Sequence, residues 1–454
     1  MINRAYLQCI IPSCGATYDV GQAITECGAC GNLLDVAYEH VVPSSFKGTF
    51  LGRRNPGNNI FNESGVHRFR ESANFTGTDS GKYGEYSKVL VSLDGLEGNT
   101  KPVNVTAVAR YVGMDPKTLY LQFEGRNPSG SFKDNGMATA FTHGKMVGAE
   151  TYACASTGNT SASAAQYAAN EGKRAFVIVG QDASPTKVAQ ALYHGAVVFK
   201  LEGPFDKAMG LIKKVADEKG VYLVNSVNPF RLEGQKTIIY RMLESLKWNP
   251  PDWIVLPFGN GGNTAAFGKA LKELYDWGWI KKMPRIAVVN ARGANTFYHL
   301  YHERGLKWNG GAANDVMIQD YYSRLHKNRV RPRTKASAVA ILKPENMKKA
   351  LRTMEWTNGV AAQVSDIEIM KALGVIGRNG FGAEIASAAA VAGIKQLVEQ
   401  GIIGRDETVV GVMTGDWWKE SKEIMAHEER KGLITVPPNI DVIYRKFDEA
   451  LRAA

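Results

Sequence analysis

The sequence predicts an α/β protein with largely parallel sheets, preceded by a separate cysteine-bearing segment. Short apolar runs alternate with helical runs over most of the chain, a pattern typical of strands joined by crossover helices. Several apolar runs end in turns rich in Gly, Ser and Asn, where such sheets present ligand sites. The chain has 454 residues, of which 44% are hydrophobic, so we expect two or three domains.

The strands can be placed from their apolar and β-branched content. Helical patterns separate them, for example over Thr160–Ala169 and in the run that follows Thr264. Because a crossover helix returns the chain in the same direction, the strands on either side should lie parallel. The predicted strands are Leu119–Phe123, Thr151–Ala155, Arg174–Gly180, Ala196–Leu201, Val221–Asn225, Asp252–Phe258, Arg285–Asn290 and Thr408–Val412.

The N-terminal segment carries four of the five cysteines, spaced C-x4-C-x12-C-x2-C. Two close pairs of thiolates match the spacing of structural zinc sites, although free or disulfide-bonded cysteines would show the same pattern. No signal peptide is visible, so we expect a cytoplasmic protein, and a disulfide scaffold is disfavoured. We predict a zinc-ribbon-like knuckle over residues 1–40, with Cys9, Cys14, Cys27 and Cys30 as ligands. The fifth cysteine, Cys154, fits the core.

The segment that follows the cysteines, residues 41–88, is rich in polar residues and glycine and shows little periodicity. We interpret it as an arm or linker that wraps the body or a partner subunit, with Phe75–Ser87 as loop. The segment Trp308–Lys335 matches no pattern that we can place. No apolar run approaches the roughly 20 residues that a membrane-spanning helix needs, so no membrane contact is expected.

The net charge of +11 leaves a second class of protein open. A zinc ribbon on a basic chain is also typical of nucleic-acid-binding proteins. The densest basic run, His326–Lys335, lacks interleaved aromatic residues, so a solvated loop or a patch that steers anionic substrates fits it better. We expect no nucleic-acid partner and keep a zinc-containing nucleic-acid-binding protein as the alternative class.

The most informative motif is Asn127–Met137, NPSGSFKDNGM, which follows a predicted strand. It places Lys133 in a turn rich in Gly and Ser. A lysine that is desolvated there loses its proton more easily, and its free amine is a nucleophile suited to Schiff-base chemistry. Most lysines are solvated surface charges, so this interpretation depends on the motifs that follow.

Three further turns follow predicted strands. Ser156–Ala165, STGNTSASAA, can simply cap a helix or can help to hold a carboxylate or phosphate. Gly259–Thr264, GNGGNT, is a phosphate cradle or a plain tight turn, and it matches neither the dinucleotide nor the P-loop pattern. Thr414, in the MTGD of Met413–Asp416, lies where α/β sheets bind ligands, although an ordinary turn also fits.

Together with Asn225–Thr237, NSVNPFRLEGQKT, these motifs resemble the threonine synthase family of fold-type II pyridoxal 5′-phosphate (PLP) enzymes. The resemblance implies two open, twisted, mostly parallel sheet domains with flanking helices, and a homodimer. It also implies an active site in the cleft between the domains. The expected division is a knuckle (1–40), an arm (41–88), a large domain (89–135 and 225–440), an inserted small domain (136–224) and a C-terminal tail (441–454).

The resemblance implies conversion of O-phospho-L-homoserine and water to L-threonine and phosphate. Lys133 would be the catalytic residue that binds the cofactor and moves protons, while Asn159 would contact the 3′-oxygen of PLP and Thr414 its ring nitrogen. The implied cofactor-binding residues are Lys133, Asn159, Gly259, Asn260, Gly261, Gly262, Asn263 and Thr414. The implied substrate-binding residues are Ser156, Thr157, Thr160, Asn225, Ser226, Arg231 and Asn260. An arginine flanked by Asn and Ser donors is also what a phosphate dianion prefers.

The chain departs from the family pattern at three places. Asn135 stands where the family usually has Arg, and Ala383-Glu384-Ile385 stands where Glu-Pro is common. The usual TGHG-like ending is replaced by TGDWWKE, Thr414–Glu420. These departures leave a second enzyme open, a paralogue that performs replacement or elimination on another phosphorylated amino acid such as O-phosphoserine.

Overall fold

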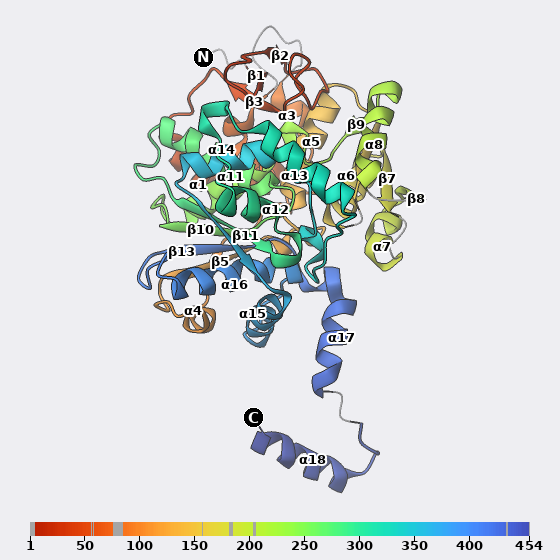
Figure 1. Ribbon diagram of the computed structural model, residues 1–454, viewed down its shortest axis with the longest axis vertical. Helices are drawn as coiled ribbons and strands as arrows, with labels where there is room; N and C mark the ends of the chain where they lie inside the picture. The colour runs from red at the N-terminus through yellow and green to blue at the C-terminus, as the bar shows by residue number, and fades with distance from the viewer. Residues whose placement is uncertain are drawn as a thin grey trace. The chain divides into compact units, whose positions relative to one another are not determined.

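The structure is a computed structural model that describes residues 5–55, 57, 59–75, 85–156, 158–180, 185–202, 206–432 and 435–453. It divides into two compact units, Met1–Lys419 and Glu420–Ala454, and each is described by itself. In the described part of the first unit, three sheets carry the strands (Figure 1).

The largest sheet has six strands in the order β12-β11-β10-β13-β5-β4, and all but the edge strand β4 run parallel. Both β10 and β13 are buried at every position, as expected for parallel strands that are covered on both faces. The strands are β4 (Pro102–Asn104), β5 (Leu119–Phe123), β10 (Trp253–Pro257), β11 (Arg285–Ala291), β12 (Val360–Val364) and β13 (Val409–Met413).

Helices lie on both sides of this sheet (Figure 1). Helix α16 (Ile385–Glu399) packs on β10 to β13, with α4 (Thr106–Val112) and α15 (Asp366–Arg378) against it. Its small residues allow the close approach, since a Cβ at Gly393 would lie 2.4 Å from the side chain of Val289. The other side carries α9 (Pro229–Gln235), α10 (Thr237–Ser245), α11 (Gly262–Asp276) and α14 (Met347–Trp356).

The second sheet has four parallel strands in the order β8-β7-β6-β9. Its strands are β6 (Thr151–Ala155), β7 (Arg174–Gly180), β8 (Val197–Leu201) and β9 (Tyr222–Leu223). The helices around it are α5 (Lys133–Met146), α6 (Asn159–Asn170), α7 (Pro185–Tyr193) and α8 (Asp206–Lys219). All eight predicted strands are therefore confirmed: three match at both ends, and the ends of the other five differ by at most two residues.

One local expectation is wrong. Helix α6 begins after Gly158, which makes no side-chain cap, so Ser156 does not cap it. The Ser156 hydroxyl instead accepts a hydrogen bond from the Gly158 N–H at 3.2 Å, within the loop that precedes the helix. Among the described residues, no side chain caps the first N–H groups of α6.

The N-terminal segment forms an antiparallel three-stranded ribbon in the order β2-β1-β3, which we call the cysteine ribbon. Its strands are β1 (Ala5–Cys9), β2 (Thr17–Asp19) and β3 (Leu34–Tyr38). Strand β3 docks on the body through polar contacts: the Tyr38 hydroxyl donates to Glu233 of α9 at 2.6 Å, and Asp35 pairs with Lys349 and Arg352 of α14.

The arm over residues 41–88 wraps the body through short helices and buried aromatic residues. Phe50, Phe69 and Phe75 are all fully buried, and the Phe69 ring lies 5.4 Å from that of Tyr240 in α10. Residues 76–84 of the expected loop lie outside the described residues. The helices are α1 (Phe46–Gly52), α2 (Ile60–Glu63), η1 (His67–Ala73) and α3 (Tyr86–Val89).

The segment Trp308–Lys335, which matched no sequence pattern, contains helix α13 (Asp315–Lys327), capped by Asn314. The basic run His326–Lys335 starts in its last turn and continues as an irregular segment that is almost entirely exposed, as predicted for a solvated loop. The remaining short helical segments of the first unit are η2 (Glu124–Arg126), η3 (Arg292–Ala294), α12 (Thr296–Tyr298), η4 (His299–Glu303), η5 (Asn309–Gly311) and η6 (Ser337–Val339); η7 (Trp417–Glu420) lies at its end.

The second unit consists of helices α17 (Ser421–Gly432) and α18 (Ile440–Ala453). The division expected from the sequence put residues up to 440 in the large domain and only 441–454 in a tail. Helix α18 exposes a stripe of apolar side chains at helical spacing: Ile440, Ile443, Tyr444, Phe447 and Leu451. Among the described residues, no helix is both long enough and apolar enough to cross a bilayer.

Candidate active site

Two distant motifs meet at the carboxyl ends of neighbouring strands. Strands β5 and β13 are parallel partners, so the turns that follow them lie side by side. The Phe132 N–H donates to the Thr414 carbonyl at 2.9 Å, and Ser131 pairs with Gly415 as an isolated bridge. The turn before Lys133 is thereby fixed on the segment that begins at Thr414.

Lys133 is the first residue of α5, and its Nζ atom lies 4.1 Å from the centre of the Phe132 ring. Burial lowers the pKa of the amine to about 7; the nearby Arg231 cation lowers it as well, whereas Glu384 raises it. A large fraction of the amine is therefore unprotonated at neutral pH. That is the state in which a lysine acts as a nucleophile.

Arg231 of α9 is a fully buried cation with unused donors. Its Nη1 donates to the Val224 carbonyl at 3.1 Å, whereas Nε and Nη2 have no hydrogen-bond partner. Burial lowers the pKa of the guanidinium to about 10, so it stays charged at neutral pH. No ion pair to Arg231 is found among the residues that the structure describes, and a buried, unpaired guanidinium is costly unless an anion binds it.

The glycine turn Gly259–Asn263 connects β10 to α11. Gly261 has φ +76°, a left-handed conformation that favours glycine, and α11 starts without a side-chain cap. The helix therefore presents free N–H groups at the positive end of its dipole. Close to this turn lie buried side-chain oxygens without a partner, those of Gln235, Asn263, Thr264 and Asn346. The free N–H groups and the Thr264 hydroxyl can donate, as the phosphate group of PLP requires, whereas the amide oxygens can only accept.

Thr414 and Asn159 are joined by a buried carboxylate that the sequence reasoning noted only as part of a departure. The Thr414 hydroxyl donates to Oε1 of Glu384 at 2.8 Å, and the Asn159 amide donates to Oε2 at 2.9 Å. Glu384 is 1% exposed and immediately precedes α16. The residue expected at the 3′-oxygen of the cofactor and the residue expected at its ring nitrogen thus share one carboxyl group.

The other residues that were expected to bind substrate differ in their burial and in their hydrogen bonds. The Asn225 amide exchanges two hydrogen bonds with the main chain of Ala155, each 3.0 Å long, and so ties β9 to β6. Just before α14, the Glu345 N–H donates to the side-chain oxygen of Asn260 and the Asn346 N–H donates to its carbonyl. Ser226 lies beside the glycine turn. Ser156 and Thr160 are partly exposed at the start of α6, and Thr157 lies outside the described residues.

A second lysine also lies near the site. Lys419 donates to Gln190 of α7 at 2.6 Å, and Gln190 donates to the Ser129 carbonyl at 3.1 Å. Burial lowers the pKa of Lys419 to about 8, and nearby Glu384 raises it. Lys419 belongs to the segment TGDWWKE, where the sequence departs from the family pattern. That departure was the only indication in the sequence that Lys419 lies near the site.

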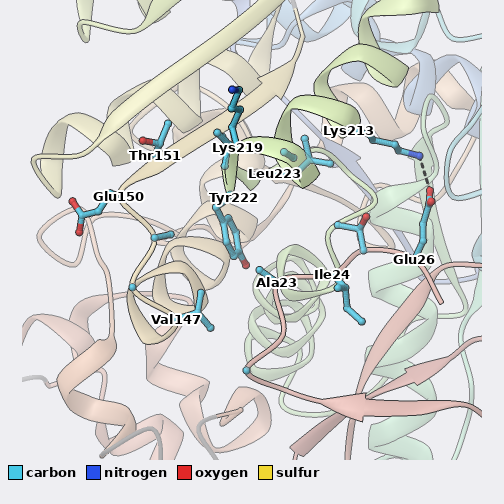
Figure 2. A pocket seen from close by; sticks show the side chains of 17 residues that line it. Ala23, Ile24, Glu26, Val147, Glu150, Thr151, Lys213, Lys219, Tyr222 and Leu223 are labelled. Atoms are coloured by element: carbon cyan, nitrogen blue, oxygen red, sulfur yellow. Dashed lines mark hydrogen bonds and ion pairs between the residues drawn. The ribbon is translucent and has the colours of Figure 1, made fainter. Parts of the chain in front are cut away.

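A separate pocket of about 840 Å³ lies at the edge of the cysteine ribbon and contains none of the expected site residues. Ribbon residues 21 and 23–26, the turn between α5 and β6, and the end of α8 line it (Figure 2). Across it, Lys213 pairs with Glu26 at 2.6 Å. This pocket is distinct from the site around Lys133.

The four ribbon cysteines form one cluster, with all sulfur atoms within 4.8 Å of one another. The distance between the sulfurs of Cys9 and Cys30 is 3.4 Å, and that between Cys14 and Cys27 is 3.7 Å. Zn–S bonds of about 2.3 Å in a tetrahedron place sulfur atoms roughly 3.8 Å apart, so the donor set fits a structural zinc ion. As expected, Cys154 is buried in the core, away from this cluster.

The fold has many relatives among solved structures. Diaminopropionate ammonia lyase from Escherichia coli aligns with a TM-score of 0.57 at 15% identity, over 73% of this chain and 87% of its own. An L-serine ammonia-lyase from Rhizomucor miehei aligns with a TM-score of 0.56 at 17% identity, over 73% and 98%. A family model described as pyridoxal-phosphate dependent enzyme matches residues 93–415. The chain therefore belongs to the pyridoxal-phosphate dependent enzyme family.

Within that family, threonine synthases are similar along most of the chain. The enzyme of Methanocaldococcus jannaschii is 38% identical over 92% of this chain and 94% of its own length. The enzyme of Methanosarcina acetivorans is 35% identical over 96% and 97%. The fold-type II architecture and the family resemblance predicted from the motifs are confirmed.

Proposed function

We propose that this chain is a threonine synthase, a PLP-dependent lyase that converts O-phospho-L-homoserine and water to L-threonine and phosphate. The observation that carries the proposal is the pairing of a lysine whose pKa is about 7 with a buried guanidinium that lacks an anionic partner. The similarity to threonine synthases over nearly the whole chain supports it. Membership of a PLP enzyme family accounts for Lys133 and the glycine turn, which a purely nucleic-acid-binding protein would leave unexplained.

In this proposal the residues of the chain supply binding, orientation and proton transfer. The glycine turn Gly259–Asn263 would hold the cofactor phosphate through N–H groups of α11, with Thr414 and Asn159 beside the ring. The cofactor, when bound, withdraws electrons from the α-carbon of an amino acid attached to it. The amine of Lys133, unprotonated at neutral pH, would accept and return protons at the substrate carbons.

Arg231 would bind the phosphate group of the substrate. Its unpaired Nε and Nη2 can donate two hydrogen bonds to two oxygens of one phosphate. Gly136 permits the approach, because a Cβ there would lie 3.2 Å from Nε. The open start of α6, with Ser156, Thr157 and Thr160, would take the substrate carboxylate and nearby polar groups.

Product analysis tests the function. Protein loaded with PLP is incubated with O-phospho-L-homoserine, and products are identified by mass spectrometry. Threonine and phosphate in equal amounts, absent with Lys133→Ala, are expected. Unchanged substrate would contradict the proposal. With O-phospho-L-homoserine, 2-oxobutyrate without threonine would show elimination in place of hydration. The same assay with O-phosphoserine tests the paralogue that the altered TGDWWKE segment leaves open.

We further propose that the cysteine cluster holds one structural zinc ion, supported by its sulfur spacing. We also propose that each chain has two lobes that follow the division inferred from the sequence, with the small lobe over 136–224. We propose further that two chains form a homodimer. Both lobes have a parallel sheet of their own, and α18 exposes an apolar stripe that a partner could cover. Light scattering coupled to size-exclusion chromatography, with and without α18, tests the dimer.

A further inference from the structure

Helix α9 turns one face to the cysteine ribbon and an adjacent face to α5. Phe230 and Glu233 are three residues apart and so share a face. Phe230 belongs to the buried hydrophobic cluster of the ribbon, and Glu233 accepts a hydrogen bond from Tyr38 of β3. Arg231 lies on the adjacent face, which packs against Gly136 of α5. The residues that the ribbon contacts therefore stand on both sides of Arg231 in the sequence.

The Tyr38 side chain fixes the Glu233 end of α9 through three contacts. Its hydroxyl donates to Oε2 of Glu233 at 2.6 Å. The Nζ atoms of Lys236 and Lys269 lie 4.9 and 5.1 Å from the centre of its ring. Both lysines also pair with Glu233, whose side chain is buried. One residue of the ribbon thus closes a buried cluster of charges on the helix that carries Arg231.

A second set of contacts fixes the Phe230 end of α9. The Phe230 ring stacks on the His143 ring of α5, with the ring centres 3.4 Å and the planes 9° apart. The Nε2 atom of His143 lies 2.8 Å from the carbonyl of Val20 in the ribbon; a carbonyl only accepts, so Nε2 carries the proton. Nδ1 then accepts from the Tyr222 hydroxyl at 2.6 Å. The ribbon is therefore tied to Phe230 both directly, through the hydrophobic cluster, and through His143.

We infer that the cysteine ribbon holds Arg231 in place for the substrate phosphate, and that Tyr38 is a positioning residue that acts through α9. The inference rests on the proposed function, because it needs a phosphorylated substrate at Arg231. Two hydrogen bonds from one guanidinium to one phosphate require that the guanidinium plane be held in register with the oxygens. Among the described residues, the guanidinium has a single hydrogen-bond partner, the Val224 carbonyl, so the helix must supply the remaining constraint.

The consequence is that the ribbon affects one part of the site and not another. The turn before Lys133 is fixed on the Thr414 carbonyl, far from the ribbon in the chain, so PLP uptake should not depend on Tyr38. Loosening the ribbon should weaken the binding of the phosphate part of the substrate alone. A general loss of structure would weaken the binding of every ligand.

Two matched ligands separate these effects. The phosphonate 2-amino-5-phosphonopentanoate has a methylene in place of the ester oxygen of O-phospho-L-homoserine and cannot lose phosphate, and norvaline is the same molecule without the phosphonate. Binding of each to the PLP-loaded protein is measured by isothermal titration calorimetry. Tyr38→Ala is expected to weaken phosphonate binding about threefold to tenfold and to leave norvaline binding unchanged. Tyr38→Phe, which keeps the ring and removes only the hydroxyl, should show a smaller loss of the same kind.

A double-mutant cycle asks whether Tyr38 acts through Arg231. Arg231→Met is expected to weaken phosphonate binding about tenfold to a hundredfold. In that background, Tyr38→Ala should cause no further loss. Tyr6→Ala provides the matched control: Tyr6 pairs with Ala37, the neighbour of Tyr38, so its side chain lies on the opposite face of the ribbon and its removal should leave both affinities unchanged.

Three results would overturn the inference. One is equal weakening of both ligands by Tyr38→Ala, and another is a further loss in the Arg231→Met background. The third is phosphonate binding that Arg231→Met does not weaken. The proposed function is decided separately, by threonine formation in the product assay, so the inference can fail while the threonine synthase proposal stands.

Discussion

The amine of Lys419 donates to the side-chain oxygen of Gln190 over 2.6 Å, and the amide of the same Gln190 donates to the carbonyl of Ser129 over 3.1 Å. One glutamine on α7 therefore links the segment after Thr414 to the turn that precedes Lys133. Both hydrogen bonds join Gln190 to residues outside α7, so this side chain fixes α7 to the site.

Gln190→Ala removes both bonds at once. Each is worth about 1 kcal/mol, so amide exchange in the turn 127–132 is expected to become faster by roughly tenfold to thirtyfold. Hydrogen–deuterium exchange with mass spectrometry measures this. Gln400→Ala, at the exposed end of α16, should leave the turn unchanged. Equal exchange in wild type and Gln190→Ala would show that the link does not hold the turn.

Lys133→Met is expected to stabilise the protein without cofactor. The folded-state pKa of about 7 lies below the ordinary value of 10.5, so the unfolded chain binds more protons between these two pH values. The penalty of burying the amine is complete below pH 7 and disappears as the pH rises toward 10.5. The gain from Met should therefore be larger at pH 6.5 than at pH 10.5, by roughly 1–3 kcal/mol, since part of the side chain remains solvated.

Urea unfolding at the two pH values checks this prediction. Lys145→Met, in the last turn of the same helix, provides the control. Its amine is largely exposed and pairs with Glu171 at 3.3 Å, so its removal should change the free energy of unfolding by about 1 kcal/mol or less. A gain from Lys133→Met that does not vary with pH would contradict the assigned pKa.

Asn135 shows how the protein tolerates the loss of the arginine that its family usually has there. Arg241 enters from α10, pairs with the buried Glu124 at 3.1 Å, and donates to Asn135 at 2.9 Å. Arg241→Met should cost about 3–5 kcal/mol, because Glu124 is left as a buried, unpaired charge. Adding Asn135→Arg should recover part of that loss, since the Asn135 amide already contacts Glu124 at 2.8 Å.

Chemical denaturation of the two single variants and of the double variant measures this coupling. In the wild-type background, Asn135→Arg should destabilise, because two guanidinium groups would then share one carboxylate. A double variant that is no more stable than Arg241→Met alone would show that an arginine at position 135 cannot replace Arg241 as the partner of Glu124.

The cysteine cluster should carry one zinc ion per chain. Cys27→Ser is expected to lose the metal and to lower the melting temperature, because a three-thiolate site binds zinc more weakly and the ribbon depends on it. Metal analysis by inductively coupled plasma mass spectrometry and a thermal melt report the two effects. Cys154→Ser, far from the cluster, should keep the metal. Unchanged stability of the wild-type protein after complete removal of zinc would contradict a structural role.

The sequence predicted the strands well because each is mainly apolar and is followed or preceded by a helical run, and the central ones, such as β10 and β13, are buried over their whole length. The glycine turn and Thr414 were found because each comes immediately after such a strand, and Lys133 because its Gly/Ser-rich turn follows one. Glu384 and Lys419 could not be given roles, because their partners Asn159 and Gln190 come from helices α6 and α7 beside the other sheet, and only folding brings them close. The arm was underestimated for a related reason: Phe50, Phe69 and Phe75 are buried without a helical or alternating period.

Strand β3 docks on residues that are synthesised long after it. Asp35 and Tyr38 leave the ribosome early, yet Glu233, Lys349 and Arg352, which hold them, are made much later. Until then the ribbon can close only on itself, through its own strands and cysteines. Its contacts with α14 therefore cannot form before residue 352 has been made, and a defect there is expected to appear as a nascent chain that is slow to mature.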